Sequence, residues 1–138
     1  MTKIKVEYLN HMGDDLFVDS EDNQAWIGWA AGILEGEGCF SMHTRGSGKR
    51  NGKVELAIHC EMTDQDTILK LQKVLGVGTV CFRENKRKDG RTRKPSWRLS
   101  IQKQSDILST LMKVSKYMSS RRSQKISEML QFLFNKFC

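Results

Sequence analysis

The stretch that decides the fold is "AAGILEGEG", residues 30–38. Its small and apolar residues are typical of a helix that packs inside a protein, yet it ends with two acids, Glu35 and Glu37. The aligned peptide groups of a helix leave partial negative charge at its C-terminus, so an acid there costs about 0.3–1 kcal/mol unless a cation lies beside it. A lysine side chain, a bound metal ion or water could meet this requirement.

Glycines recur along the same helix, which we expect to begin near residue 20. Gly28, Gly32 and Gly36 stand four residues apart, with Ala31 and Glu35 beside them, so we expect all five on one helix face. A glycine inside a helix costs about 1 kcal/mol relative to alanine. The most direct explanation for a row of glycines at this cost is that a second backbone packs closely against the helix. We expect Gly28, Ala31, Gly32 and Glu35 to lie at an interface.

The charge of the chain is unevenly distributed. Its 138 residues have the length of a single domain with one core, and its net charge is +7. Residues 1–37 carry two lysines against eight acids, whereas residues 83–98 carry eight basic residues against two acids. Such segregation is typical of a protein that binds a polyanion, although a basic loop in solvent would look the same. We expect one domain over residues 20–138, preceded by a partly disordered extension over residues 1–19.

Cysteine and histidine residues give no sign of a zinc site. Cys39, Cys60, Cys81 and Cys138 form no C-x-x-C pair, and the three histidines lack ligand spacing. A chain of this size does not need disulfides, so a reduced compartment is favoured. The N-terminus "MTKIKVEYLN" is too short and too polar for a signal peptide. The chain contains no run of about 18 apolar residues, so we expect no membrane partner.

After residue 38 the hydrophobic period changes from that of a helix to that of strands. "CFSMHTR" and "VELAIHCEM" alternate apolar and polar residues on either side of a loop, and "VGTVCFR" and "SWRLSIQ" do the same around a basic tip, which predicts two hairpins. Helical spacing predicts "DQDTILKLQKVLG" between the hairpins, capped at Thr63 or Asp64 and stopped by Gly76. Two helices follow, one opening at Ser105 and the other at residue 119 or 120.

The predicted fold class is α+β, in the order αββαββαα. Its two hairpins are expected to form a single four-stranded antiparallel sheet with helices on the apolar face. The other face is polar and fringed with Lys and Arg, which suits reading base edges in a DNA groove and contacting phosphates, although a merely solvated face would alternate likewise. The residues expected to contact DNA are Ser41, His43, Arg45, Lys49, Arg50, Lys53, Glu55, His59, Thr79, Arg83, Lys86, Arg87, Lys88, Arg91, Arg93, Lys94, Arg98, Ser100 and Gln102.

The opening stretch resembles the signature of the LAGLIDADG homing endonucleases, with Ala30 in the leucine position and Glu35 and Glu37 in the two aspartate positions. Further landmarks follow in the family's order over residues 22–132: the helix start "MTDQD", the turn "LGVGTV" and the helix start "SSRRSQKI". The resemblance implies that the sheet forms a DNA-binding saddle. It also implies a homodimer, because this chain has one motif, whereas chains with two act as monomers.

The same resemblance implies the position of a metal site. Two copies of the motif helix would pack together, and Glu37 of each, with the backbone carbonyl of Gly36, would hold a divalent metal over a scissile phosphate. The expected cofactor is Mg²⁺ or Mn²⁺, with Ca²⁺ as a substitute that does not support cleavage, and no small-molecule cofactor is expected. A metal and DNA would make an acid at this helix end reasonable.

Other members of the family's pocket have weaker matches in this chain. A polar residue at the end of the second strand matches Glu61, which would position water or be an exposed acid. A basic residue at the start of a late helix matches Arg121 or Arg122, where a cation is unfavourable unless a phosphate lies nearby. The resemblance implies that Glu61, Arg121 and Arg122 act in catalysis with Glu37, and that Glu35 is mostly structural.

The leading prediction is a sequence-specific, intron-encoded homing endonuclease that makes a staggered double-strand break in a long, roughly palindromic site. The palindrome follows from two-fold protein symmetry. The protein is expected to be intracellular, with access to DNA, and not secreted. The main alternative is a family relative that does not cleave and acts as an RNA maturase or a DNA-binding regulator. An unrelated basic α+β module is the third possibility.

Overall fold

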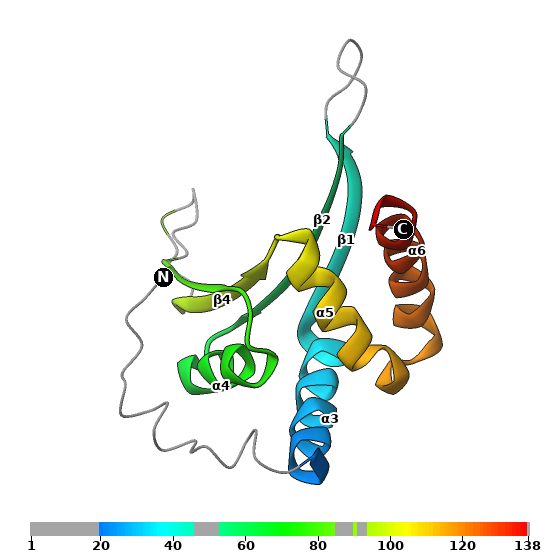
Figure 1. Cartoon of the computed structure of the whole chain (residues 1–138). Coiled ribbons are helices and arrows are strands. Elements are labelled where there is room, and N and C mark those ends of the chain that lie inside the picture. Colours follow the sequence, from blue (N-terminus) through cyan, green and yellow to red (C-terminus); the bar gives the residue numbers. More distant parts are fainter. Residues whose placement is uncertain (1–19, 46–52, 85–89, 91–93, 138) are drawn as a thin grey trace.

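A computed structural model describes residues 20–45, 53–84, 90 and 94–137. The four strands form one antiparallel sheet in the order β1-β2-β4-β3, which confirms the predicted fold class. Figure 1 shows the long β1–β2 hairpin extending beyond the helices, with α6 alongside it. The elements are α3 (Ser20–Glu37), β1 (Gly38–Arg45), β2 (Lys53–Met62), α4 (Gln65–Leu75), β3 (Thr79–Arg83), β4 (Ser96–Ile101), α5 (Gln104–Val114), the 3-10 helix η1 (Ser115–Tyr117) and α6 (Ser120–Phe137).

The register of the strands decides which side chains share a sheet face. Cys39 of β1 pairs with His59 of β2, His59 pairs with Ser100 of β4, and Ser100 pairs with Thr79 of β3. Directly paired residues project to the same side of a sheet, and every second residue along a strand joins them. One row of polar residues therefore crosses all four strands, and the polar residues predicted for one face do share it.

The opposite face of the sheet carries the core. Helices α3, α4, α5 and α6 pack over it, and α6 also contacts β1. Fully burying an aliphatic side chain contributes about 1.5–3 kcal/mol, so this layer holds the fold together. The largest fully buried side chains of the core are Leu34, Ile58, Ile68, Leu71, Leu75, Leu99, Ile101, Ile107, Leu111, Ile126 and Met129.

The predicted start and end of α4 are confirmed by its caps. The carboxylate of Asp64 accepts a hydrogen bond from the backbone nitrogen of Asp66 at 3.1 Å. Gly76 ends the helix with a φ of 74°, and its backbone nitrogen donates to the carbonyl of Gln72 at 2.8 Å. Glycine adopts this left-handed conformation without the penalty that a Cβ brings, which explains the residue at this position.

The prediction that Ser105 opens the next helix is wrong. The carbonyl of Lys103 already accepts a hydrogen bond from the backbone nitrogen of Ile107 at 2.9 Å, so α5 begins at residue 104. The predicted continuous helix also ends early, at residue 114, and tightens into η1. In contrast, Ser119 precedes α6 as predicted, and its carbonyl accepts a hydrogen bond from the backbone nitrogen of Ser123 at 2.8 Å.

The junction between α3 and β1 has no loop. Glu37 is the last residue of α3 and Gly38 is the first of β1. A Cβ built on Gly38 would lie 2.5 Å from the carbonyl oxygen of Leu34, closer than real Cβ atoms approach. The final glycine of the signature therefore lets the helix run directly into the strand, which fixes the position of Glu37 at the edge of the sheet.

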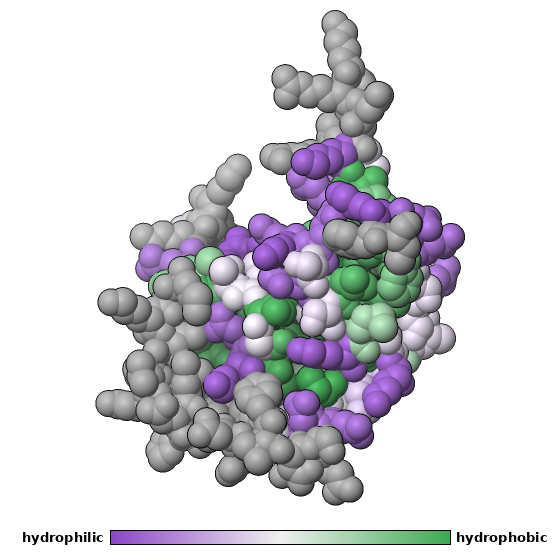
Figure 2. Space-filling view, viewed as in Figure 1, coloured by the Kyte–Doolittle hydropathy of each residue, from purple (hydrophilic) through white to green (hydrophobic). Residues whose placement is uncertain are grey.

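Large apolar side chains remain in solvent on the helical side of the molecule. Figure 2 shows hydrophobic residues gathered over α5 and α6, between hydrophilic ones. Met112 of α5 is 59% exposed and Phe134 of α6 is 43% exposed. Within the described ranges, no helix has both the length and the apolar character needed to cross a membrane.

Candidate nucleic-acid interface and metal site

The exposed face of α3 is narrower than the sequence predicts. Gly32 and Gly36 are exposed, and a Cβ on either would have no described atom within 4 Å. A Cβ on Gly28 would lie 3.7 Å from the ring of Tyr117, so this glycine is partly covered within the protomer. The bare surface of the helix thus centres on two glycines rather than three.

The prediction that Ala31 lies on this face is wrong. Its side chain is fully buried in the protomer core. Successive residues of a helix are rotated by about 100°, so a residue next to Gly32 projects toward a different side. Ala31 packs toward the sheet and the other helices, and it cannot contact a second chain in this arrangement.

Glu35 joins the end of α3 to the start of α6. One of its carboxylate oxygens accepts a hydrogen bond from the hydroxyl of Ser119. Its other oxygen, Oε2, is buried and has no hydrogen-bond partner among the residues that the structure describes. These contacts suit the structural role expected for Glu35. Its side chain remains partly exposed, and its place at an interface stays a prediction.

Glu37 is exposed, and it forms no ion pair or hydrogen bond with another described residue. The last turn of α3 contains no basic residue. Burial and, secondarily, the negative charge of Glu37 raise the pKa of the Cys60 thiol to about 11, which places the carboxylate near the first β1–β2 pair. Among the residues that the structure describes, no lysine compensates this acid, and a metal ion or water remains compatible with its exposure.

The donor atoms at this helix end fit a hard divalent cation. The carboxylate of Glu37 and the backbone carbonyl of Gly36 are oxygen ligands, which Mg²⁺ and Ca²⁺ prefer. In the part of the chain that the structure describes, no group of three or more His, Cys, Asp and Glu side chains is placed to hold a metal ion. Mg²⁺ is often held by only one or two carboxylates together with waters and substrate phosphates, so this donor set is compatible with it.

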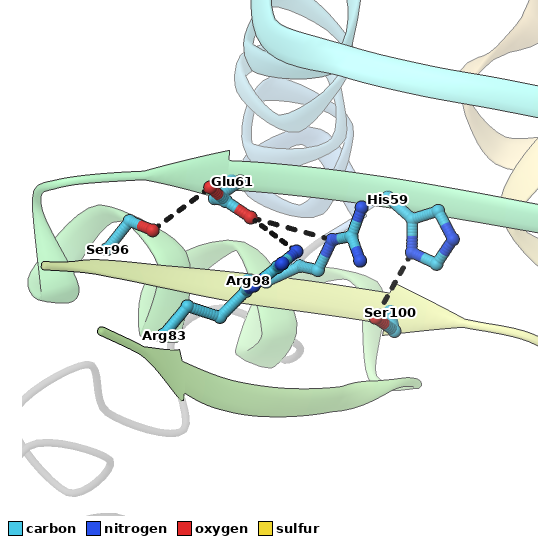
Figure 3. A network of polar contacts seen from close by, with 6 residues as sticks. All are labelled: His59, Glu61, Arg83, Ser96, Arg98 and Ser100. Atoms are coloured by element: carbon cyan, nitrogen blue, oxygen red, sulfur yellow. Dashed lines mark hydrogen bonds and ion pairs between the residues drawn. The ribbon is translucent and has the colours of Figure 1, made fainter. Parts of the chain in front are cut away.

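Polar contacts connect three strands on the open face of the sheet (Figure 3). The Oε1 atom of Glu61 on β2 accepts a hydrogen bond from Nη1 of Arg83 on β3 at 3.2 Å and lies 3.6 Å from Nε of Arg98 on β4. Its Oε2 atom accepts a hydrogen bond from the hydroxyl of Ser96 at 3.0 Å. We call Glu61, Arg83, Ser96 and Arg98 the arginine–glutamate network.

His59 lies beside this network, and its Nδ1 is 3.1 Å from the hydroxyl of Ser100. Burial and then the positive charges of Arg98 and Arg83 lower the pKa of the imidazole below its ordinary value of 6.5. The ring is therefore neutral at neutral pH, and it can offer a donor or an acceptor to a base edge. The polar face thus brings together four of the residues predicted to contact DNA: His59, Arg83, Arg98 and Ser100.

A groove of about 450 Å³ continues this surface along β1 and β2. At its margin, Nε2 of His43 lies 3.6 Å from a carboxylate oxygen of Glu55. The hydroxyl of Ser41 donates a hydrogen bond to the carbonyl of Ala57 at 3.4 Å. The predicted DNA-contacting residues that line the groove are Ser41, His43, Lys53, Glu55, His59 and Gln102.

The two arginines of the predicted catalytic set lie in the first turn of α6, next to Ser119, which contacts Glu35 near the end of α3. Arg122 packs its guanidinium over the ring of Phe40 at 5.7 Å, and its Nε is buried with no hydrogen-bond partner in the described part of the chain. Arg121 is exposed at the start of α6. No ion pair joins either arginine to Glu37 or Glu61 among the described residues. Their catalytic roles stay predictions.

The remaining predicted DNA contacts lie partly inside and partly outside the described residues. Thr79 and Lys94 are exposed in the structure, and Arg45 pairs with Lys53 through the backbone of the first hairpin. The predicted extension over residues 1–19 lies outside the described residues. The same holds for Lys49, Arg50, Lys86, Arg87, Lys88, Arg91 and Arg93.

Sequence reasoning missed Ser96 and the pairing of Glu61. Ser96 is a buried polar residue opposite Arg83 in the β3–β4 register. Alternation along "SWRLSIQ" places its first serine on the polar face with Arg98, which was the available signal. The pairing of Glu61 with Arg98 depends on β2 lying next to β4, and no local pattern carries that information.

The polar sheet face and the unpaired acid at its edge fit a class of protein that binds nucleic acid and holds a metal ion. A model of the LAGLIDADG endonuclease family matches residues 30–134. The chain therefore belongs to the LAGLIDADG endonuclease family. The comparison with curated proteins found no match.

Solved structures of homing endonucleases share the fold. I-CvuI, in complex with its target in the presence of Ca, matches with a TM-score of 0.65 and 22% identity, over 83% of this chain and 69% of that chain. I-TnaI matches with a TM-score of 0.59 and 20% identity, over 78% of this chain and 71% of that chain. The group I intron-encoded I-CeuI, complexed with DNA, matches with a TM-score of 0.61 and 16% identity, over 89% of this chain and 59% of that chain.

Proposed function

We propose that this chain is a homodimeric, metal-dependent homing endonuclease that makes a staggered double-strand break in a long, roughly palindromic DNA site. The observation that carries the proposal is Glu37, an exposed acid with no described partner at the end of a helix whose free face is bare glycine. Family membership supports DNA cleavage, and the structures of I-CvuI with its target and of I-CeuI with DNA support duplex DNA as the substrate.

The homodimer is supported by the exposed glycines of α3. Gly32 and Gly36 leave a strip of backbone without side chains, and no described atom fills the space above it. Each glycine costs about 1 kcal/mol of helix stability relative to alanine, and close packing with a second α3 would offset that cost. Two-fold pairing through this face would bring the two copies of Glu37 toward one axis and place two sheets along one DNA duplex.

Catalysis is assigned to the end of α3. The Glu37 carboxylate and the Gly36 carbonyl would hold Mg²⁺ or Mn²⁺, with the remaining positions taken by water, DNA phosphate or the second chain. When bound, such a metal activates water and neutralises charge that develops on the phosphate and the leaving oxygen. The exposed Arg121 is available for a phosphate at the start of α6, where a helix N-terminus also favours an anion.

Recognition is assigned to the polar sheet face and the basic hairpin tips. Hydrogen-bonding side chains such as His59 and Arg98 would contact base edges, whereas lysines such as Lys53 and Lys94 would contact phosphates. If the tips neutralise six or more phosphates, the affinity should fall by about 10³-fold or more between 50 and 200 mM salt. A flat salt titration would count against this assignment.

The activity can be tested on a DNA target that the protein itself selects. Duplexes that bind the protein are selected from a randomised library in Ca²⁺, cloned into a plasmid, and incubated with the protein in Mg²⁺ or in a chelator. We expect linear DNA with staggered ends in Mg²⁺ alone. Selection of a site that is bound but never cut in Mg²⁺ or Mn²⁺ would instead favour the non-cleaving regulator, and preferential binding of structured RNA would favour the maturase.

The chain provides its own probes for the face that contacts DNA. Cys39 and Cys81 are exposed on the polar sheet face, whereas Cys60 is buried on the opposite face. We expect the selected duplex to slow the alkylation of Cys39 and Cys81 by N-ethylmaleimide, and Cys60 to react slowly with or without DNA. Unchanged alkylation of both exposed thiols at saturating DNA would contradict the assigned face.

A further inference from the structure

In the arginine–glutamate network, the carboxylate of Glu61 has partners at both oxygens, whereas Arg98 keeps part of its hydrogen-bonding capacity unused among the described residues. Glu61 uses both carboxylate oxygens within the protein, through Ser96, Arg83 and Arg98. The terminal nitrogens of Arg98, Nη1 and Nη2, form no hydrogen bond or ion pair with any residue that the structure describes. The carboxylate of Glu61 is therefore used inside the protein, whereas the outer nitrogens of Arg98 are available to a ligand.

We propose that Glu61 is a positioning residue that orients the guanidinium of Arg98 so that its two terminal nitrogens read one guanine of each half-site in the DNA major groove. This inference rests on the function proposed above. It assigns Glu61 a different role from the catalytic one that the sequence suggested. It also names a base that this chain recognises.

The contact that orients Arg98 is made through its inner nitrogen. The Nε atom is buried, has no hydrogen-bond partner among the described residues, and lies 3.6 Å from Oε1 of Glu61, within the range of an ion pair. The attraction of the carboxylate turns the Nε edge of the planar guanidinium toward Glu61, so the two outer nitrogens are free to contact a ligand. The side chain of Arg98 keeps 36% of its surface exposed, so its outer end is accessible to a ligand.

The position of Glu61 is itself fixed by two further groups. Ser96 is buried and donates to Oε2 at 3.0 Å, while Arg83 donates to Oε1 at 3.2 Å. Glu61 and Arg98 are also direct neighbours in the β2–β4 register. Figure 3 shows these side chains converging on Glu61 from three strands of one sheet face. Because the support comes from rigid strands, the orientation exists before DNA binds, and it need not be created at the cost of binding energy.

Guanine is the base that this arrangement matches. In the major groove guanine presents two acceptors, N7 and O6, at the spacing of the two outer nitrogens of arginine. Adenine replaces one acceptor with a donor, and cytosine presents a donor, so each leaves an unfavourable contact. The two arginines outnumber the single carboxylate, so the network keeps a net positive charge facing the DNA. The neighbouring His59, whose pKa is lowered by burial and by both arginines, adds no charge at neutral pH.

The test compares base preferences after selection from a randomised duplex pool. The variants are Arg98→Ala, Glu61→Gln and the double variant, with Glu128→Gln on α6 as a control that removes one acid away from the sheet. We expect the unmodified protein to select guanine at one position of each half-site. Arg98→Ala should reduce that preference by about 5- to 150-fold, the discrimination of a bidentate contact, and leave the other positions unchanged.

The double variant decides whether Glu61 acts through Arg98. We expect Glu61→Gln to weaken the guanine preference at the same position and to cause no further loss of preference in the Arg98→Ala background. Retained guanine preference in Glu61→Gln would overturn the proposal, as would lost cleavage with an unchanged preference. Should Glu61→Gln fail to fold in a thermal melt, unchanged preference in Arg98→Ala would overturn the proposal by itself. If the unmodified protein selects no duplex at all, the proposed function fails instead.

Discussion

Two acids flank the same β1–β2 pair, Glu37 directly before Gly38 and Glu61 directly after Cys60, and the structure presents them in opposite ways. At the end of α3, Glu37 is exposed and no described side chain pairs with it. In the arginine–glutamate network, the carboxylate of Glu61 meets two arginines and a serine. The sequence suggested that both acids belong to one catalytic pocket. The structure separates them by their partners: one region is incomplete within the protomer, and the other is already assembled.

The difference shows how unsatisfied groups indicate function. An exposed acid at a helix C-terminus is unfavourable by itself, and a bare glycine face weakens the helix that carries it. Both features become favourable when a metal, a DNA phosphate and a second chain are added. A network with its own internal partners needs none of these additions to form, so it is better suited to present a fixed recognition surface.

The largest effect is expected from Glu37→Gln. The amide keeps the shape of the side chain but removes the anionic ligand, so DNA cleavage should fall by more than about 10²-fold, which exceeds the loss typical of outer-shell changes at metal sites. Binding of the same duplex should change only a few-fold. Single-turnover cleavage and equilibrium binding measure the two quantities. Cleavage at the normal rate would show that Glu37 does not hold the metal, and the proposed difference in role between Glu37 and Glu61 would be wrong.

Gly32→Leu tests whether the open face of α3 is completed by a second chain. No described atom lies within 4 Å of a Cβ at this position, so the protomer should fold normally. A leucine would hold two paired helices apart, and the dimer dissociation constant should rise by about tenfold or more. Sedimentation at several concentrations measures this change, with Gly32→Ala as a smaller step. A variant that stays dimeric and cuts normally would refute the packing.

Gly38→Ala is expected to act on the protomer rather than on the dimer. Its Cβ would meet the carbonyl oxygen of Leu34 at 2.5 Å, which should destabilise the fold by about 1–3 kcal/mol. Urea unfolding at fixed protein concentration measures this loss. A Gly38→Ala variant as stable as the unmodified protein would contradict the tight junction between α3 and β1.

The smallest effect concerns pH and His59. The pKa of His59 is lowered in the folded protein, so below about pH 6.5 the unfolded chain binds more protons at this site. The contribution of His59 to stability is therefore present above pH 6.5 and is lost as the pH falls. His59→Gln should remove this part of the decline in urea unfolding between pH 7 and pH 5. Parallel pH profiles for both proteins would contradict the crowding of His59 by the two arginines.

Local patterns predicted the layers of this fold well, because side-chain alternation is a property of each strand by itself. The faces occupied by Phe40, Ser41 and Leu99 follow directly from a period of two. Ala31 was misassigned because spacing along a helix was treated as one broad face. The contact between the Gly28 position and Tyr117 could not be foreseen, because it depends on where α5 ends, and the place of Gly28 at an interface stays a prediction.

The sequence was enough to predict which residues form the candidate site, but not the hydrogen bonds and ion pairs between them. The signature at residues 30–38 indicated Glu37, because an acid at the C-terminus of a helix is unfavourable without a cation nearby. The partners of Glu61 lie on two other strands, 22 and 35 residues away for the hydrogen bonds to Arg83 and Ser96. Those contacts exist only because β2 pairs with β4 rather than with β3, and strand order in a sheet is decided by the whole core.

The most direct test places Glu37→Gln and Glu61→Gln side by side on the duplex selected by the unmodified protein, with cutting and base preference measured for both. The account predicts that Glu37→Gln keeps the base preference and loses cutting, while Glu61→Gln loses the preference for guanine at one position of each half-site. The account is contradicted if both variants lose cutting with their preferences intact, because the two acids would then share one catalytic role.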